Sequence, residues 1–214
     1  MALNLANGTT VHIAAAFDAE KTATAVTNAA EAAVTATAHG LESGDIIVFD
    51  SGWSKLDGRV FRVVKTSADA FKLEGADTSN TAAYPAGAGV GRFRKIKSWA
   101  VLDQILEISM SGGEQQYFSY GFLDEDVERQ LPTVKSAMSI TFGVADDPTR
   151  PGYIAAVKAD EAKARTPMMI RTPNSTILYN GLFGVNKVPS LARNEGMKAT
   201  IAYAIDGGIT RYPV

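Results

Sequence analysis

The sequence predicts a mainly β protein, a β-sandwich or barrel with one central helix, and a small all-β domain inserted into it. Three observations support this fold class. Short apolar runs separated by glycine turns fill residues 38–73, apolar and polar residues alternate over residues 197–205, and a helix signature covers residues 148–164. Short strands at regular spacing are typical of small barrels and sandwiches, and a single helix then has to pack against a sheet.

Composition narrows the class of function. The chain has 214 residues, of which 46% are hydrophobic, so it can build a substantial core. The formal net charge of −2 and the isoelectric point near 5.7 argue against a dedicated nucleic-acid-binding protein, which would carry a basic face. The absence of cysteine excludes disulfides, thiolate catalysis and cysteine-based zinc sites.

The beginning of the chain gives no targeting signal. Residues 1–17 have no basic region ahead of an apolar run, so we expect no signal peptide. No apolar run in the sequence is long enough to span a bilayer. We therefore expect a soluble protein that is made in the cytoplasm and has no membrane partner.

The first third of the chain reads as short strands. Residues 9–17 follow an Asn-Gly turn and predict a strand, and the Ala- and Thr-rich residues 21–38 favour short extended pieces. Residues 46–49, 60–64 and 70–73 are apolar strands separated by turns. His39 stands just before a glycine, and we expect it to fix that turn rather than to perform chemistry.

These strands define the expected inserted domain. A loop, residues 78–91, follows the last of them, and its glycines do not match a phosphate-binding pattern. The expected division is a β core and an insert, with the core formed by residues 1–22 and 94–214 and the insert by residues 23–93.

A basic run comes directly after that loop. Its four cations are Arg92, Arg94, Lys95 and Lys97. Such a run is usually a solvated strand edge, and the alternative is a patch that meets an acidic partner surface.

The next segment predicts two strands and an acidic loop. Residues 99–110 favour a strand that ends at Ser-Gly-Gly, and in a continuous strand Asp103 and Glu107 would share one face. Residues 115–123 are aromatic and β-like. An acidic cluster follows them, formed by Asp124, Glu125, Asp126 and Glu128. Paired carboxylates can perform acid–base chemistry or bind a cation, but the spacing lacks the EF-hand glycine and terminal glutamate, so a solvated or partner-facing loop is the main interpretation.

The last third alternates strands with the single helix. Residues 134–144 alternate as a half-buried strand. Its apolar side is formed by Val134, Met138, Ile140, Phe142 and Val144. Asp147 and Pro148 predict an N-cap and first helical residue, for a helix over residues 148–164. Three further strands are expected at residues 166–171, 175–185 and 197–205.

Catalytic signatures are missing. The chain has two histidines, His12 and His39, no H-E-x-x-H and no G-x-S-x-G. A carboxylate pair of the glycosidase kind stays open, because its separation is not visible in a sequence. We expect a structural or binding protein and not an enzyme, with no cofactor and no metal.

One segment resembles a known family. Residues 36–78 resemble a segment found in tail proteins of long-tailed bacteriophages, through T-A-H-G-L-x-x-G-D, L-D-G-R-x-F-x-V and F-K-L-E-G-A-D-T, which begin at Thr37, Leu56 and Phe71. The flanking chain is similar in pattern to the major tail tube proteins of lambda-like siphoviruses. The resemblance implies a β core of two sheets, one central helix, and a long hairpin that would fall in residues 99–123. Lambda-type proteins carry an extra domain at the carboxyl terminus, whereas here the extra domain would be the insert.

The resemblance also implies a role. Proteins of this family form homohexameric rings, stacked into a tube that conducts double-stranded DNA during injection. The implied partners are further copies of the chain, a tape measure protein in the lumen, and tail terminator and distal tail proteins. The implied location is the virion tail, after assembly in the host cytoplasm.

Physical arguments suggest which residues would serve that role. A lumen through which DNA slides should carry few cations, because cation–phosphate contacts hold DNA in a salt-dependent way. Asp103 and Glu107 are therefore the candidate lumen residues. The basic run and the acidic cluster are candidates for contacts between subunits or rings, and we expect the insert on the outside of the tube.

Two other functions are left open. The chain could be another ring-forming tail or neck component, such as a terminator or distal tail protein. It could instead be a carbohydrate- or receptor-binding module, for which Trp53 and Tyr84, expected to be exposed, are the only support.

Overall fold

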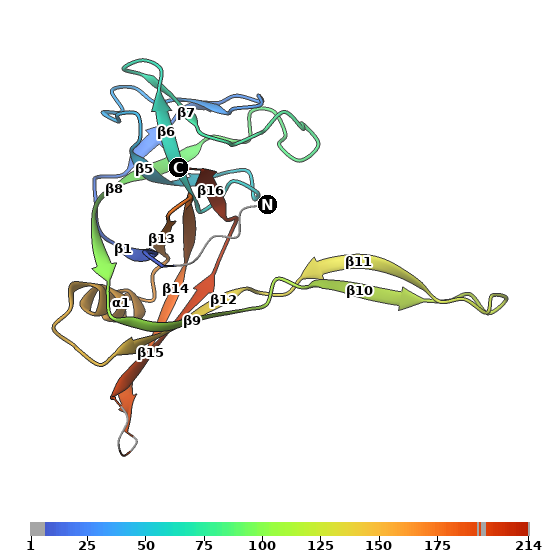
Figure 1. The fold of residues 1–214 in the computed structure, drawn as a ribbon. Helices are drawn as coiled ribbons and strands as arrows, with labels where there is room; N and C mark the ends of the chain where they lie inside the picture. Colours follow the sequence, from blue (N-terminus) through green and yellow to red (C-terminus); the bar gives the residue numbers. More distant parts are fainter. Residues whose placement is uncertain (1–6, 192, 194–195, 214) are drawn as a thin grey trace.

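The structure is a computed structural model that describes residues 7–191, 193 and 196–213, and these residues form sixteen strands and one helix (Figure 1). Fourteen of the strands belong to one strongly curled sheet, and two form a separate hairpin. The path through the large sheet runs β3-β4-β7-β6-β5-β8-β1-β13-β14-β15-β12-β9, with β2 paired to β8 and β16 paired to β14.

A long loop, residues 74–90, separates β7 from β8, and the other connections between elements are shorter. The strands before the helix are β1 (Thr10–Phe17), β2 (Lys21–Ala23), β3 (Ala25–Val26), β4 (Ala33–Thr35), β5 (Ile46–Ser51), β6 (Arg59–Lys65), β7 (Ala70–Leu73), β8 (Gly91–Leu102), β9 (Ile105–Ser111), β10 (Gln115–Tyr120), β11 (Arg129–Lys135) and β12 (Ser139–Ala145). The helix α1 (Pro151–Ala162) is followed by β13 (Thr166–Thr172), β14 (Ser175–Ser190), β15 (Lys198–Ile205) and β16 (Thr210–Pro213).

Strand β8 joins two parts of the molecule. Its first residues pair with β5 and β2, and its later residues pair with β1. The basic run lies in the first part of this strand, which has neighbours on both sides. The expectation of a solvated sheet edge is therefore wrong for this part of the strand, because β5 pairs with it on one side and β2 on the other.

The main core lies between the helix and the part of the large sheet that contains β12 and β15. Alternate residues of β12 and β15 point into it, among them Phe142, Val144 and Ile201, and Ala156 and Ala159 of α1 cover them. This burial confirms the expected alternation only within β12 and β15. Val134 and Met197, expected on the same apolar sides, lie before these strands and are exposed. At Gly152 a β-carbon would come within 2.4 Å of the carbonyl oxygen of Val101, so only glycine lets the helix approach β8 this closely.

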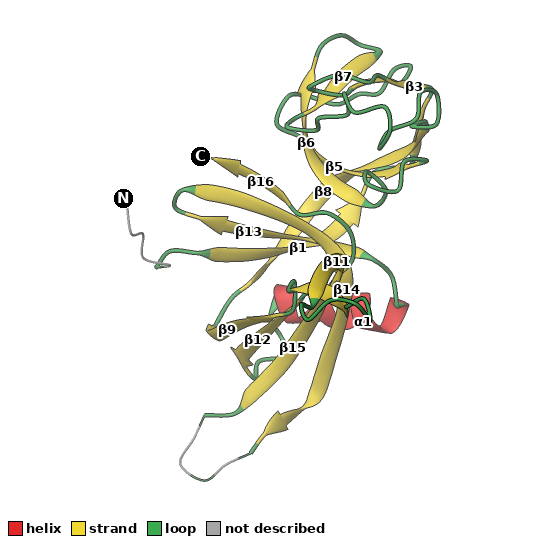
Figure 2. Cartoon of the chain, turned by 90° about the vertical axis from the view of Figure 1, so that its right-hand side faces the viewer, coloured by secondary structure: helices red, strands yellow, loops and turns green. Residues whose placement is uncertain are grey.

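A second core lies in the part of the molecule that carries β5, β6 and β7, at the top of Figure 2. All its buried members come from residues 23–93, which we call the 23–93 lobe, and they include Phe49, Trp53, Phe61, Phe71 and Phe93. Trp53 is only 2% exposed, and its indole N–H donates to the carbonyl of Pro85 at 2.7 Å. The expectation of an exposed Trp53 is therefore wrong, and Tyr84 packs edge-on against it.

The lobe is joined to the rest of the chain by buried contacts. A third apolar cluster combines Val48 and Val60 of the lobe with Met169, Leu178 and Tyr212. The hydroxyl of Tyr212 accepts a hydrogen bond from the backbone N–H of Arg62 at 3.0 Å and donates to the carbonyl of Glu74 at 3.1 Å.

The helix begins later than expected. Arg150 is the N-cap residue and Pro151 the first helical residue, whereas Asp147 and Pro148 lie ahead of the helix. The carboxylate of Asp147 instead accepts hydrogen bonds from the backbone N–H and the hydroxyl of Thr149. Both Pro148 and Pro151 could be the first residue of the helix. Asp147 forms a local turn with Thr149, and the helix therefore begins at Pro151.

The strand expected over residues 99–110 is broken. Gln104 has a φ of 54°, in the left-handed region, and separates β8 from β9. The strand expected over residues 134–144 is also divided, into β11 and β12. The long hairpin therefore lies at residues 115–135, which we call the arm, and not at residues 99–123 as expected.

Candidate functional site

Four strands present a face of small and polar residues that points away from the main core. Strands β14, β15, β12 and β9 are neighbours in that order, and their paired residues place the same side chains together. The members of this small-residue face are Glu107, Ser109, Ser111, Ser139, Thr141, Gly143, Ala145, Leu182, Gly184, Asn186, Lys198, Thr200, Ala202 and Ala204. Glu107 and Lys198 are its charged members, so the face has little net charge and no cationic cluster.

The two candidate lumen residues lie in different places. Glu107 belongs to the small-residue face and lies across Gly143, where an added β-carbon would come within 2.8 Å of its Cγ. Asp103 lies in the break between β8 and β9, and its carboxylate is 3.4 Å from a guanidinium nitrogen of Arg150. The expectation that the two acids share one strand face is wrong, because Gln104 interrupts the alternation.

The four-stranded unit ends at β9 on one side and at the second half of β14 on the other. Within the described residues, β9 pairs with β12 alone and ends the sheet path. Strand β14 pairs with β13 only as far as Gly181, and beyond that point the same side faces α1. There the backbone N–H of Val185 donates to the carboxylate of Asp160 at 3.4 Å.

The arm projects far from the body of the molecule and has no core of its own (Figure 1). Most of its residues are exposed, including Phe118, Phe122, Leu123 and Val134. Some aromatic rings stack along it, as Phe118 and Tyr120 do with centroids 6.4 Å apart. A two-stranded ribbon with so much apolar surface in water is marginally stable on its own.

The acidic cluster lies at the tip of the arm. Glu125 pairs with Arg129 at 2.8 Å, and Asp124, Asp126 and Glu128 make no ion pair within the described part of the chain. All four carboxylates are exposed.

Most of the basic run has partners within the chain. Arg92 pairs with Glu20 at 3.0 Å, Lys95 pairs with Asp45 at 2.6 Å, and Arg94 lies over the ring of Phe17 at 5.1 Å. Lys97 is exposed. The arm tip is far from β8 in Figure 1, so the acidic and basic groups do not meet within one chain, and a contact between chains stays a prediction.

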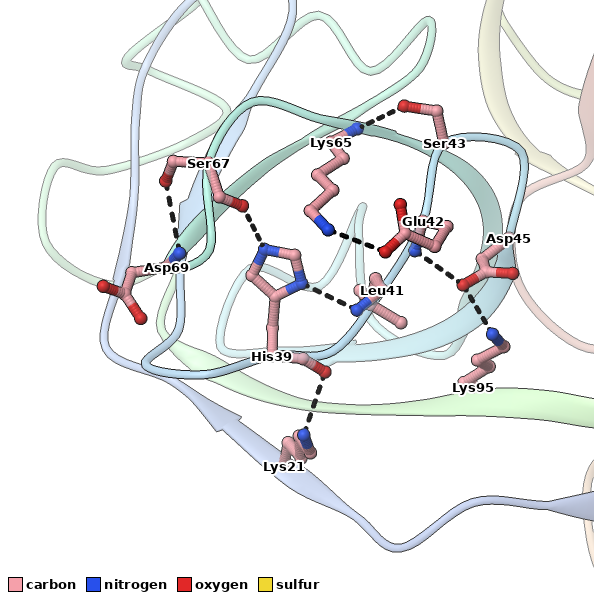
Figure 3. A network of polar contacts seen from close by, with 10 residues as sticks. All are labelled: Lys21, His39, Leu41, Glu42, Ser43, Asp45, Lys65, Ser67, Asp69 and Lys95. Atoms are coloured by element: carbon pink, nitrogen blue, oxygen red, sulfur yellow. Dashed lines mark hydrogen bonds and ion pairs between the residues drawn. The ribbon is translucent and has the colours of Figure 1, made fainter.

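The motif that begins at Thr37 builds a turn. The backbone N–H of Leu41 donates to Nδ1 of His39 at 2.9 Å, and Nε2 of the same ring lies 2.9 Å from the carbonyl of Ser67 (Figure 3). Gly40 and Gly44 have φ angles of 68° and 95°. The backbone N–H of Glu42, which lies between them, donates a hydrogen bond to the carboxylate of Asp45. The expectation that His39 fixes this turn is confirmed.

A groove runs between α1 and the strands β1 and β8. Its volume is about 520 Å³, and alanines from all three elements make up most of its lining. We call it the α1 groove. The helix α1, which forms one side of this groove, lies on the opposite side of the body from the arm (Figures 1 and 2).

The described residues offer little for catalysis. They contain no group of three or more histidine or acidic side chains that could hold a metal ion. Burial and the charge of Arg171 lower the pKa of His12, whose ring is hydrogen-bonded to Thr10. Among these residues no helix is long and apolar enough to cross a membrane.

Comparison with known proteins identifies the family. No curated protein matches the chain. A family model described as phage tail tube protein matches residues 51–214, which is well over half of the chain and includes the small-residue face, the arm and the helix. The β-rich architecture with a single helix agrees with the fold class expected for this family. The chain belongs to the phage tail tube protein family.

Proposed function

We propose that the protein forms hexameric rings that stack into the tail tube of a siphovirus and that DNA passes through the tube during injection. The observation that carries this proposal is the small-residue face. An antiparallel sheet with one face on a core normally exposes polar side chains on the other face, and here that exposed face is broad, nearly neutral and made mostly of small residues. Small side chains without a cationic cluster give phosphates few sites at which to bind.

The strand edges supply a way to close the ring. An unpaired edge is a template for another strand, and a closed barrel removes all edges. Strand β9 of one copy could pair with the outer side of β14 of the next, so that the small-residue faces line one continuous barrel. Under this proposal Glu107 faces the lumen and Asp103 does not.

The remaining contacts follow from the same arrangement. The exposed arm and its acidic tip would contact a neighbouring subunit or ring. Arg94 and Lys97 of the basic run make no ion pair among the described residues, and Lys97 is the exposed one of the two. We also infer that residues 23–93 are an inserted domain on the outside of the tube, since its core is closed within those residues. A tape measure protein in the lumen, terminator and distal tail proteins at the ends, and assembly in the host cytoplasm belong to this proposal, as does a structural and not a catalytic role.

Electron microscopy of the purified chain tests the proposal. The expected result is tubes of uniform width with a central channel. Isolated rings that do not stack would point to a terminator or distal tail role, and monomers at all concentrations would contradict self-assembly. A variant sharpens the test. Thr200→Arg places a cation on the small-residue face and should leave the fold intact, and tubes of this variant should begin to retain DNA at low salt.

A further inference from the structure

The α1 groove is an apolar hollow that the chain leaves open. Ala14 of β1, Ala100 of β8, and Ala155 and Ala159 of α1 form its floor and walls, and Ile154 lies at its rim with 40% of its surface exposed. Residues this small leave space that larger side chains would fill in a closed core. Lys158 is the charged residue of the lining, and it makes no ion pair within the described part of the chain.

The arm tip carries large apolar side chains with nothing to cover them. Leu123 is fully exposed, at 111% of its reference surface, and Phe122 is 54% exposed. Asp124 and Asp126 follow directly and make no ion pair among the described residues. The tip therefore combines two bulky apolar groups with unpaired negative charge, which complements an apolar groove whose charged group is a lysine.

The geometry excludes contact between the two surfaces within one chain. The arm leaves the body on one side and α1 lies on the other, as Figure 1 shows from the side and Figure 2 shows along the arm. The two surfaces can therefore meet only between different copies. A contact between two different patches of the same chain is head-to-tail, and such a contact forms a ring or an open filament.

We propose that the α1 groove of one copy receives Phe122 and Leu123 from the arm tip of a neighbouring copy, with Lys158 paired to Asp124 or Asp126. The inference rests on the proposed self-assembly and names the surface that receives the arm. Each copy then gives one tip and receives one, so every interior copy of an assembly has both surfaces covered.

Cross-linking tests the contact directly, because the natural chain has no cysteine. The full-length variant with Leu123→Cys and Ile154→Cys should form a ladder of covalently linked chains on mild oxidation, since a disulfide forms only where the two Cα atoms come within about 7 Å. Each single variant should give at most dimers. The matched control combines Leu123→Cys with Ala68→Cys, an exposed position on the 23–93 lobe, and it should give no ladder.

A second pair of variants separates this contact from self-assembly as a whole. Ala155→Trp fills the groove and should reduce tube yield at least tenfold while circular dichroism stays unchanged. Lys158→Glu should also reduce tube yield, and combining it with Asp124→Lys and Asp126→Lys should restore it.

The outcomes distinguish the two proposals. Wild-type tubes with no ladder from the Leu123–Ile154 pair, an equal ladder from the Ala68 control, or full tube yield from Ala155→Trp would each overturn the groove contact and leave the tube function standing. Wild-type protein that remains monomeric would overturn the tube function as well.

Discussion

The 23–93 lobe and the arm both extend from the same sheet, but the aromatic residues of the lobe are buried and those of the arm are exposed. The lobe encloses Phe49, Trp53 and Phe61, each at most 2% exposed, whereas more than half of the surface of Phe118 and Phe122 in the arm is in contact with solvent. Apolar surface removed from water stabilises the folded chain, and the same surface left in water contributes nothing until a partner covers it. The lobe therefore buries its aromatic residues within one chain, whereas those of the arm could be buried only by a partner in an assembly.

Trp53→Ala should have the largest effect on the isolated chain. Loss of this buried side chain should lower the free energy of unfolding by about 3–5 kcal/mol, because it leaves a cavity and removes the donor to Pro85. Chemical denaturation of the monomer measures this. A loss below about 1 kcal/mol would mean that the lobe does not depend on its own core, and the contrast with the arm would fail.

Tyr212 gives a test of how much the contact between the lobe and the rest of the chain contributes to stability. Burial raises the pKa of Tyr212 from its ordinary value of 10.0 to about 12. The protonated hydroxyl of Tyr212 therefore adds to the free energy of unfolding. This contribution is fully present below pH 10 and is lost as the pH rises through 12, by about 2–3 kcal/mol in total.

The measurement is the difference in stability between wild type and Tyr212→Phe across this pH range. The variant lacks the titrating hydroxyl, so the advantage of the wild type should shrink between pH 10 and 12. A constant difference would show that the hydroxyl does not titrate in this interval.

His39→Ala should have a smaller effect that is confined to the lobe. It leaves the buried N–H of Leu41 without its acceptor and removes an edge contact to Phe71, which should cost about 1–3 kcal/mol. The matched control is His12→Ala, which removes the other histidine and a partly exposed contact to Thr10. Equal losses for the two variants would contradict the role given to the Thr37 motif.

Phe122→Ala should have the smallest effect on the monomer and a large effect on assembly. Its ring is exposed, so the free energy of unfolding should change by no more than about 0.5 kcal/mol. Charge reversal at Asp124 and Asp126 should behave in the same way. Tube yield counted by electron microscopy should fall for both, and normal yield with unchanged stability would show that the arm tip is not used.

The sequence predicted the strands correctly where apolar and polar residues alternate over a long run. Alternation predicted that Ile140, Phe142 and Val144 would be buried, and they are. It failed at Gln104, because a glutamine gives no indication of a left-handed backbone, and so Asp103 was expected to share a strand face with Glu107 although it lies between two strands. The carboxyl-terminal strand β16 was also missed. Its buried residues, Thr210 and Tyr212, do alternate with exposed ones, but four residues are too few for that alternation to be recognised in the sequence.

The functional surfaces were harder to predict for a physical reason. An apolar residue in a strand is normally buried in its own chain, and the arm departs from this rule. Trp53 was expected at the surface and is in a core, while the aromatic residues of the arm look like core residues and are exposed. The partner that would cover the arm is another chain, so its presence leaves no mark in the periodicity of this one.

Hydrogen exchange in the monomer and in the tube tests the contrast between lobe and arm most directly. The amides of β5 and β6 should be protected in both states, and those of β10 and β11 should exchange fast in the monomer and slowly in the tube. Arm amides that are as well protected in the monomer as those of the lobe, or that remain unprotected in the tube, would contradict the account.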